Sequence, residues 1–142
     1  MANLRQVSGT LTISTHGQGL VEFTDKVLEW VEAQEMREGL LTLFCRHTSA
    51  SLLIQENAAR EVRADLQDFF TFLAPEEPGR YRHDDEGPDD MPAHLRTALT
   101  QVQLSIPVME GRPALGTWQG IYLFEHRRVP HRREVAVHLL GD

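Results

Sequence analysis

Apolar side chains recur at every second position in several short stretches of this chain. Between positions 6 and 14, Val7, Leu11 and Ile13 alternate with serine and threonine, a period typical of a β-strand with one buried face. Tight turns, including Glu110-Gly111, join several such stretches, which favours an antiparallel sheet over βαβ units. The predicted strands are residues 6–14, 39–46, 51–55, 101–109, 112–115, 118–126 and 133–140, the last two paired as a hairpin.

Three further stretches are predicted helices, the first two from apolar residues at helical spacing. Thr24 is a candidate N-cap for a helix ending near residue 36, and Asn57 for a helix over residues 58–73. Pro92 suits the first turn of a third helix, over residues 91–100. Length and composition fit one domain over residues 1–142. We therefore predict an α+β fold in which about three helices pack on an antiparallel β core.

Charge and cysteine content argue against several protein classes. The formal net charge is −7, which disfavours unspecific binding to DNA or RNA, because such binding relies on basic residues. Cys45 is the single cysteine, so no disulfide can form within the chain, as suits a reducing compartment. The sequence has no signal-peptide pattern and no apolar stretch of about 20 residues that could cross a bilayer. We expect a cytoplasmic protein that binds neither nucleic acid nor membrane.

A first candidate site lies at the end of the predicted strand 39–46. His47, Thr48 and Ser49 follow at this point, and a strand end can present an imidazole and two hydroxyls into a cleft. All three are therefore candidates for catalysis. The same residues also fit a structural role, in which the histidine binds a carbonyl and the hydroxyls satisfy nearby backbone groups.

A second candidate site surrounds residues 74–90, an acidic connection that is long for a small domain. His83 lies in this connection, and His94 lies on the first turn of the third predicted helix. With His47 they offer three corners of a tetrahedral metal site with the fourth position open, as in zinc enzymes. A solvated acidic loop with incidental histidines is the alternative. Mg²⁺ would instead prefer the carboxylates of Asp84, Asp85, Asp89 and Asp90.

A third candidate site is the segment 115–120, where glycines bracket Trp118. Such glycines indicate that backbone or ligand approaches closely. Gln119 can orient a polar ligand, and Glu125 can serve as a general base or as a ligand. Alternatively, Trp118 is a core residue and Glu125 pairs with an arginine.

A fourth candidate site is the arginine-rich segment 127–133, which begins at Arg127. Guanidinium groups bind phosphate oxygens in pairs, so this segment is a candidate phosphate clamp, with a solvated hairpin tip as the alternative. The sequence contains no Walker loop, no dinucleotide-binding glycine motif and no nucleophile elbow. Cys45 lies within an apolar strand, which favours a buried structural thiol over a nucleophile.

Three strings in the chain resemble the signatures of the YjbQ-like family. The first is His-Thr-Ser-Ala-Ser at 47–51, followed by Gln-Glu-Asn-Ala at 55–58. The second is Asp-Asp-Met-Pro-Ala-His at 89–94. The third is Gly111, then Leu-Gly-Thr-Trp-Gln-Gly-Ile at 115–121 and Glu-His-Arg at 125–127. Their order and separation also match, and the resemblance runs from about residue 8 to residue 140.

This resemblance implies a compact α+β protein with a sandwich-like β core, usually assembled as a homotrimer. It also implies a secondary thiamine-phosphate synthase, which joins a pyrimidine pyrophosphate to a thiazole phosphate and releases pyrophosphate. The pocket so implied contains His47, Thr48, Ser49, His83, His94, Trp118, Gln119 and Glu125, with Asn57 and Asp65 in support. Combining it with the candidate sites above, we expect catalysis by His47, Thr48, Ser49 and Glu125, substrate binding by Asn57, Trp118, Gln119 and Arg127, and a metal at His47, His83 and His94. The acidic segment 84–90 and the basic segment 127–133 depart from the family pattern.

Three functions are compatible with these residues. The first is the synthase reaction, with Arg127, Arg132 or a bound Zn²⁺ or Mg²⁺ stabilising the departing pyrophosphate. Its expected partner is a small molecule that bears phosphate. The second is hydrolysis by a metal-bound water with Glu125 as general base, for which the sequence names no substrate. The third is a non-catalytic trimeric module that binds a small anion.

Overall fold

The structure is a computed structural model in which residues 3–142 are described. Those residues form eight strands and three helices. The helices are α1 (Thr24–Ala33), α2 (Arg60–Leu73) and α3 (Asp90–Leu99). The strands are β1 (Arg5–Ser14), β2 (Gly19–Glu22), β3 (Gly39–Cys45), β4 (Ala50–Glu56), β5 (Gln103–Met109), β6 (Arg112–Pro113), β7 (Gln119–Glu125) and β8 (Arg132–Gly141).

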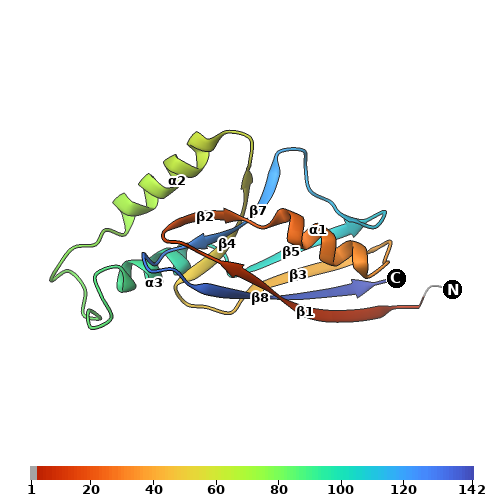
Figure 1. The fold of residues 1–142 in the computed structure, drawn as a ribbon, viewed down its shortest axis with the longest axis horizontal. Helices are drawn as coiled ribbons and strands as arrows, with labels where there is room; N and C mark the ends of the chain where they lie inside the picture. Colours follow the sequence, from red (N-terminus) through yellow and green to blue (C-terminus); the bar gives the residue numbers. More distant parts are fainter. Residues whose placement is uncertain (1–2) are drawn as a thin grey trace.

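The strands form two antiparallel sheets that share one core (Figure 1). The larger sheet has the order β1-β8-β3-β5-β6, and the smaller sheet has the order β2-β7-β4. Leu41 of β3 and Leu139 of β8 are fully buried with Leu123 of β7, so the inner faces of both sheets contribute to this core. Val27 and Val31 add the apolar side of α1. These observations confirm the predicted α+β class.

The strand β7 is buried on both of its faces, and this explains why its burial does not alternate. Ile121 and Leu123 belong to the core between the sheets. On the other face, the ring of Phe124 packs edge-on against Phe70 of α2, with ring centroids 5.4 Å apart. The smaller sheet therefore lies between the larger sheet and α2.

Several large apolar side chains remain uncovered within residues 3–142. The helix α2 buries only Phe70, while Phe72 on the same helix is 84% exposed. On the outer face of the larger sheet, Leu40 and Phe44 of β3 and Leu140 of β8 are each about half exposed. Such surfaces are unusual for a protein that stays monomeric.

Three sequence predictions about the fold are wrong. The strands β7 and β8 do not pair as a hairpin, because the segment between them crosses from the smaller sheet to the larger one. Residues 19–22, for which no strand is predicted, form β2 and pair with β7. Asn57 does not cap α2, because its side-chain amide donates to Glu22 Oε2 at 3.1 Å and Ala59 occupies the cap position.

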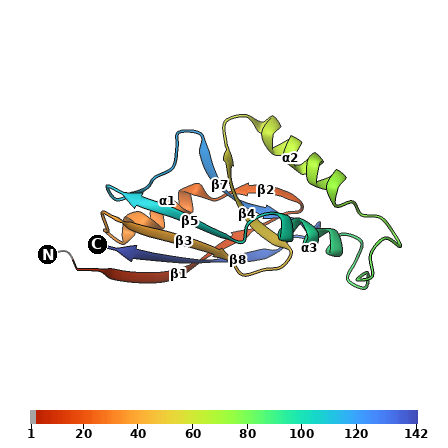
Figure 2. The same ribbon diagram turned by 180° about the vertical axis from the view of Figure 1, so that it is seen from behind.

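The candidate site residues other than Asn57, Trp118 and Gln119 gather at one end of the molecule. Both views show α2, α3 and their connecting loop at the end opposite the two termini (Figures 1 and 2). The register of β4 on β7 pairs Ala50 with Glu125, so the segment after β3 and the segment after β7 meet at this same end. In residues 3–142, no helix is long and apolar enough to span a bilayer.

Candidate functional site

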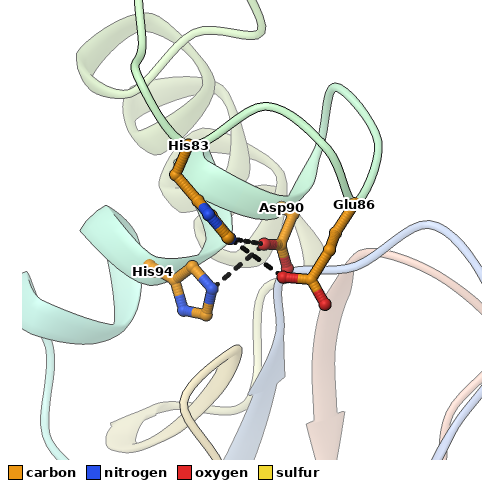
Figure 3. Close-up of side chains that lie close together, drawn as sticks. All are labelled: His83, Glu86, Asp90 and His94. Carbon is orange, nitrogen blue, oxygen red and sulfur yellow. Dashed lines mark hydrogen bonds and ion pairs between the residues drawn. The ribbon is translucent and has the colours of Figure 1, made fainter.

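Four potential metal ligands converge around the first turn of α3 (Figure 3). Asp90 and His94 lie one helical turn apart, and His83 and Glu86 approach them from the preceding loop. One nitrogen or oxygen atom of each residue lies within 4.8 Å of those of the other three. These four residues are called the His83–His94 cluster below.

Asp90 Oδ2 is the centre of this cluster. It lies 2.8 Å from His83 Nε2 and 3.1 Å from His94 Nε2. Glu86 Oε2 lies 2.9 Å from the same nitrogen of His83. The hydrogen bond to Asp90 raises the pKa of His83. Burial opposes ionisation of Asp90, but the nearby His94, His83 and Arg127 outweigh burial and hold its pKa below the usual range.

The surrounding groups orient these ligands. His94 Nδ1 lies 2.8 Å from the carbonyl oxygen of Thr48, a contact that requires the proton on Nδ1 and leaves Nε2 directed at the cluster. Arg127 donates from Nη1 to Asp90 Oδ1 at 2.8 Å and from Nε to Asp89 Oδ2 at 3.0 Å. Asp89 also accepts from the backbone N–H of Arg128, so its carboxylate faces the arginines and not the cluster.

A recess of about 670 Å³ adjoins the cluster, and the two share His94. Its wall is mostly apolar, with polar groups from the segment that follows β3 and from α3. This volume falls within the usual range for small-molecule sites. The residues that line it are Phe44, Cys45, Arg46, His47, Thr48, His94, Thr97, Ala98 and Val102.

The structure does not bring His47 together with the other two predicted metal ligands. His47 lies on the recess, outside the His83–His94 cluster, and its Nε2 accepts a hydrogen bond from the backbone N–H of Glu134 at 2.7 Å. Burial lowers the pKa of His47, and the nearby Arg133 lowers it further. His47 is therefore a neutral acceptor beside the recess.

The predicted catalytic hydroxyls occupy different environments. Thr48 is exposed at the recess, and its carbonyl oxygen holds His94. Ser49 is buried, and its hydroxyl accepts a hydrogen bond from Arg133 Nη2 at 3.0 Å. Thr48 thus borders the candidate site, while Ser49 belongs to the polar group described next.

Glu125 is fully buried between the two sheets. Its carboxylate pairs with Arg133 of β8, accepts from Thr15 Oγ1 at 2.7 Å, and accepts from the backbone N–H of Arg127 at 3.1 Å. Burial opposes its ionisation, but Arg133 and Thr15 outweigh burial and lower the pKa of Glu125. The geometry is that of an ion pair joining the sheets, which matches the alternative in which Glu125 pairs with an arginine and leaves its carboxylate enclosed.

The remaining predicted ligand-binding residues lie at the far end of the smaller sheet. The backbone N–H of Asn57 donates to the carbonyl of Trp118 at 3.0 Å, and Glu56 pairs with Gln119. The six residue steps of β7 that separate Gln119 from Glu125 span about 20 Å. Trp118 is 62% exposed, so it is not a core residue.

Sequence reasoning missed one member of the cluster and gave others different roles. Glu86 was not singled out, although it lies three residues after His83 and four before Asp90. Helix α3 begins at Asp90, so Asp90 and His94 lie on the same helix face. The predicted helix starts at residue 91 and therefore does not include Asp90. Arg127 contacts the Asp90 carboxylate of the cluster, and Asp65 is exposed on α2.

Replacement of Arg133 tests the structural ion pair. Arg133→Met leaves the buried Glu125 carboxylate without its cation and should lower the free energy of unfolding by about 3–5 kcal/mol. The matched control is Arg46→Met, which removes an exposed pair with Glu134 at 3.5 Å and should cost less than about 1 kcal/mol. Urea unfolding monitored by circular dichroism measures both. Equal losses in the two variants would contradict the assignment.

A second prediction concerns the pH dependence of stability. His126 is fully buried, its Nε2 lies 2.9 Å from Ser51 Oγ, and burial lowers its pKa to about 3. A histidine in an unfolded chain titrates near pH 6.5. Below that pH, His126 is therefore protonated in the unfolded chain but stays neutral in the folded chain. The contribution of His126 to the free energy of unfolding is thus fully present above about pH 6.5. It decreases as pH falls toward 3, by at most about 1.4 kcal/mol per pH unit.

The variant His126→Gln separates this effect from other titrating groups. Its free energy of unfolding, measured in urea at several pH values from 7 to 4, should fall less steeply than that of the unmodified chain. Parallel curves for the two proteins would mean that His126 does not supply the pH dependence.

Comparison with known proteins assigns the chain to a family. Residues 9–142 match the family model described as UPF0047 protein YjbQ-like. A UPF0047 protein of Synechocystis is 52% identical over 99% of this chain and 96% of its own length. The UPF0047 protein YjbQ of Escherichia coli O157:H7 is 41% identical over 94% of this chain and 96% of its own length.

Solved structures agree with this assignment. A protein of unknown function from Sulfolobus solfataricus superposes with a TM-score of 0.90 at 25% identity, covering 99% of this chain and all of the other. A conserved hypothetical protein of Thermus thermophilus superposes with a TM-score of 0.78 at 38% identity, covering 91% of this chain and 97% of the other. The chain belongs to the YjbQ-like UPF0047 family.

Proposed function

We propose that this protein is an enzyme that binds one divalent transition metal at the His83–His94 cluster and hydrolyses a phosphate-bearing small molecule in the adjoining recess. One observation carries the proposal. Both ring nitrogens of His94 face oxygen acceptors, the Thr48 carbonyl and the Asp90 carboxylate. A neutral imidazole carries a single N–H, so the contact between Nε2 and Asp90 needs a cation or an added proton.

The donor set favours a transition metal over Mg²⁺. Two imidazole nitrogens and the Asp90 carboxylate suit Zn²⁺, Mn²⁺ or Fe²⁺ and leave Glu86 free to act as a base, whereas Mg²⁺ prefers oxygen ligands and bound water. The predicted Mg²⁺ alternative has little support, because Asp84 and Asp85 are exposed and Asp89 faces Arg127. Zn²⁺ is thus the preferred choice between the two metals considered.

The cluster differs from a solvated acidic loop in how its ligands are held. The Asp90 side chain is only 4% exposed, and one of its oxygens is fixed by Arg127 while the other faces the two histidines. His94 is fixed through its other nitrogen by the Thr48 carbonyl. Supporting contacts of this kind accompany metal ligands in most characterised sites.

The residues around the metal position suggest how hydrolysis would proceed. A bound metal lowers the pKa of its water enough to supply hydroxide near neutral pH. Glu86 is exposed and contacts His83, so it can accept the proton of that water in place of the buried Glu125. Arg46 and His47 line the recess and can bind the phosphate oxygens of a substrate.

The synthase reaction implied by the family resemblance is the second candidate. The recess of about 670 Å³ is large enough for a ligand with two ring systems, which a pyrimidine and a thiazole would require. The same metal would then stabilise the pyrophosphate that leaves. Assembly as a homotrimer in the cytoplasm is part of this proposal, and the exposed apolar face of the larger sheet supports self-association.

Metal content tests the cluster directly. Protein purified without a histidine tag should carry about one transition metal per chain by elemental mass spectrometry, and His83→Ala and His94→Ala should each lose it. His47→Ala and Asp84→Asn are the controls, since His47 lies outside the cluster and Asp84 is an exposed acid of the same loop. Loss of metal in His47→Ala, or retention in His94→Ala, would contradict the proposed ligand set.

Turnover tests the reaction class. Hydrolysis of p-nitrophenyl phosphate should stop on chelation and return on addition of Zn²⁺ or Mn²⁺. Glu86→Gln should lower kcat by about 10²-fold or more while metal remains bound, because Glu86 would accept the proton from water. The same variants are also assayed for joining a pyrimidine pyrophosphate to a thiazole phosphate. Turnover in that assay, lost in the metal-free protein, would identify the synthase. Unchanged hydrolysis after complete metal removal would refute a metal-dependent hydrolase.

A further inference from the structure

We infer that the substrate is a phosphate monoester whose organic group is uncharged and apolar, and that this group lies along the wall of the recess formed by Phe44, Ala98 and Val102. This inference rests on the proposed function and deepens it by naming the substrate class. The phosphate would lie at the metal and the alkyl or aryl group in the recess. Phosphates of sugars and nucleotides, whose organic groups are strongly hydrated, would be poor substrates.

Helix α3 sets the position of this wall relative to the metal cluster. His94 belongs both to the cluster and to the recess. Ala98, four residues later, lies one turn further along the same helix face, about 6 Å away along the helix axis. Val102 follows the end of the helix and continues the wall. An apolar surface therefore starts within reach of the first few carbons of an ester held at the cluster.

The described residues that line the recess present it with no unpaired charge. Arg46 is paired with Glu134, whose Oε2 lies 3.5 Å from Arg46 Nη1. His47 accepts from the Glu134 backbone at Nε2 and so carries its proton on Nδ1, a donor that suits a phosphate oxygen. His94 Nε2 faces Asp90. A charged organic group would lose water in this recess without gaining a partner, so the recess favours an uncharged one.

Two hydrogen bonds hold the walls of the recess in place. The backbone N–H of Cys45 donates to the Val102 carbonyl at 2.7 Å, which joins the end of β3 to the segment after α3. His94 Nδ1 donates to the Thr48 carbonyl at 2.8 Å, which fixes α3 against the segment after β3. Because the wall is tied on both sides before a ligand arrives, burial of an apolar group there requires little ordering of the protein.

Binding of alkyl phosphonates tests the substrate class, because a P–C bond replaces the bond that would be hydrolysed. Calorimetry on Zn²⁺-loaded protein should show the dissociation constant falling about two- to fourfold per methylene from butyl to octyl phosphonate. The octyl compound should thus bind at least about tenfold more tightly than the butyl compound. A phosphonate of equal length that ends in a carboxylate should lose this gain, because the apolar wall would desolvate the carboxylate.

Two neighbouring positions of α3 supply a matched pair of variants. Ala98→Gln places an amide on the wall and should reduce the gain from butyl to octyl to about twofold or less, because the chain would desolvate that amide. Leu99→Gln is the control and should keep the full gain, since Leu99 is 60% exposed on the same helix and is not among the residues that line the recess. Equal affinity for butyl and octyl phosphonate, or an undiminished gain in Ala98→Gln, would overturn the inference.

Hydrolysis of the matching alkyl phosphates separates this inference from the proposed function. The leaving alcohols of the series have nearly equal reactivity, so differences in kcat/KM report binding of the chain. We expect kcat/KM to rise with chain length as the affinities do. Equal hydrolysis at every chain length would reject the substrate class and leave the metal-dependent hydrolase intact. Tighter binding of longer chains without any hydrolysis would reject the hydrolase and support the apolar ligand class.

Discussion

The contact between Asp90 and Arg127 joins the start of α3 to the segment that leaves β7, and the candidate site depends on it. Arg127 holds one oxygen of Asp90 and one of Asp89, which leaves the second oxygen of Asp90 facing His83 and His94. Without this guanidinium, the carboxylates of Asp89 and Asp90 would lose the cation that they share. The same segment follows Glu125, whose ion pair with Arg133 joins the two sheets.

These two ion pairs divide the polar residues of this end into a structural set and a candidate chemical set. Glu125, Arg133, Thr15 and Ser49 bond to one another in a buried layer between the sheets. His83, Glu86, Asp90 and His94 lie nearer solvent and next to a recess. The Glu125–Arg133 group is thus buried more deeply than the His83–His94 cluster. This arrangement is physically reasonable, because burial penalises any change of charge.

Period-two patterning predicted most strands well, since half-buried antiparallel strands such as β1 and β8 alternate by necessity. It could not predict which sheet a strand joins, so β7 and β8 were paired wrongly. The same limit affects the site. Residue types identified His83 and His94 as metal-ligand candidates, but only the fold separates His47 from them and adds Glu86. Exposure of Trp118, likewise, depends on packing that no local pattern encodes.

The most direct test of a metal centre is its position in a crystal. Crystals grown with Zn²⁺ should give an anomalous peak, present above the zinc absorption edge and absent below it, bounded by His83 Nε2, His94 Nε2 and Asp90 Oδ2. The distances to these atoms should be about 2.0–2.2 Å. No peak at this cluster despite saturating Zn²⁺, or a peak at His47 instead, would contradict the account.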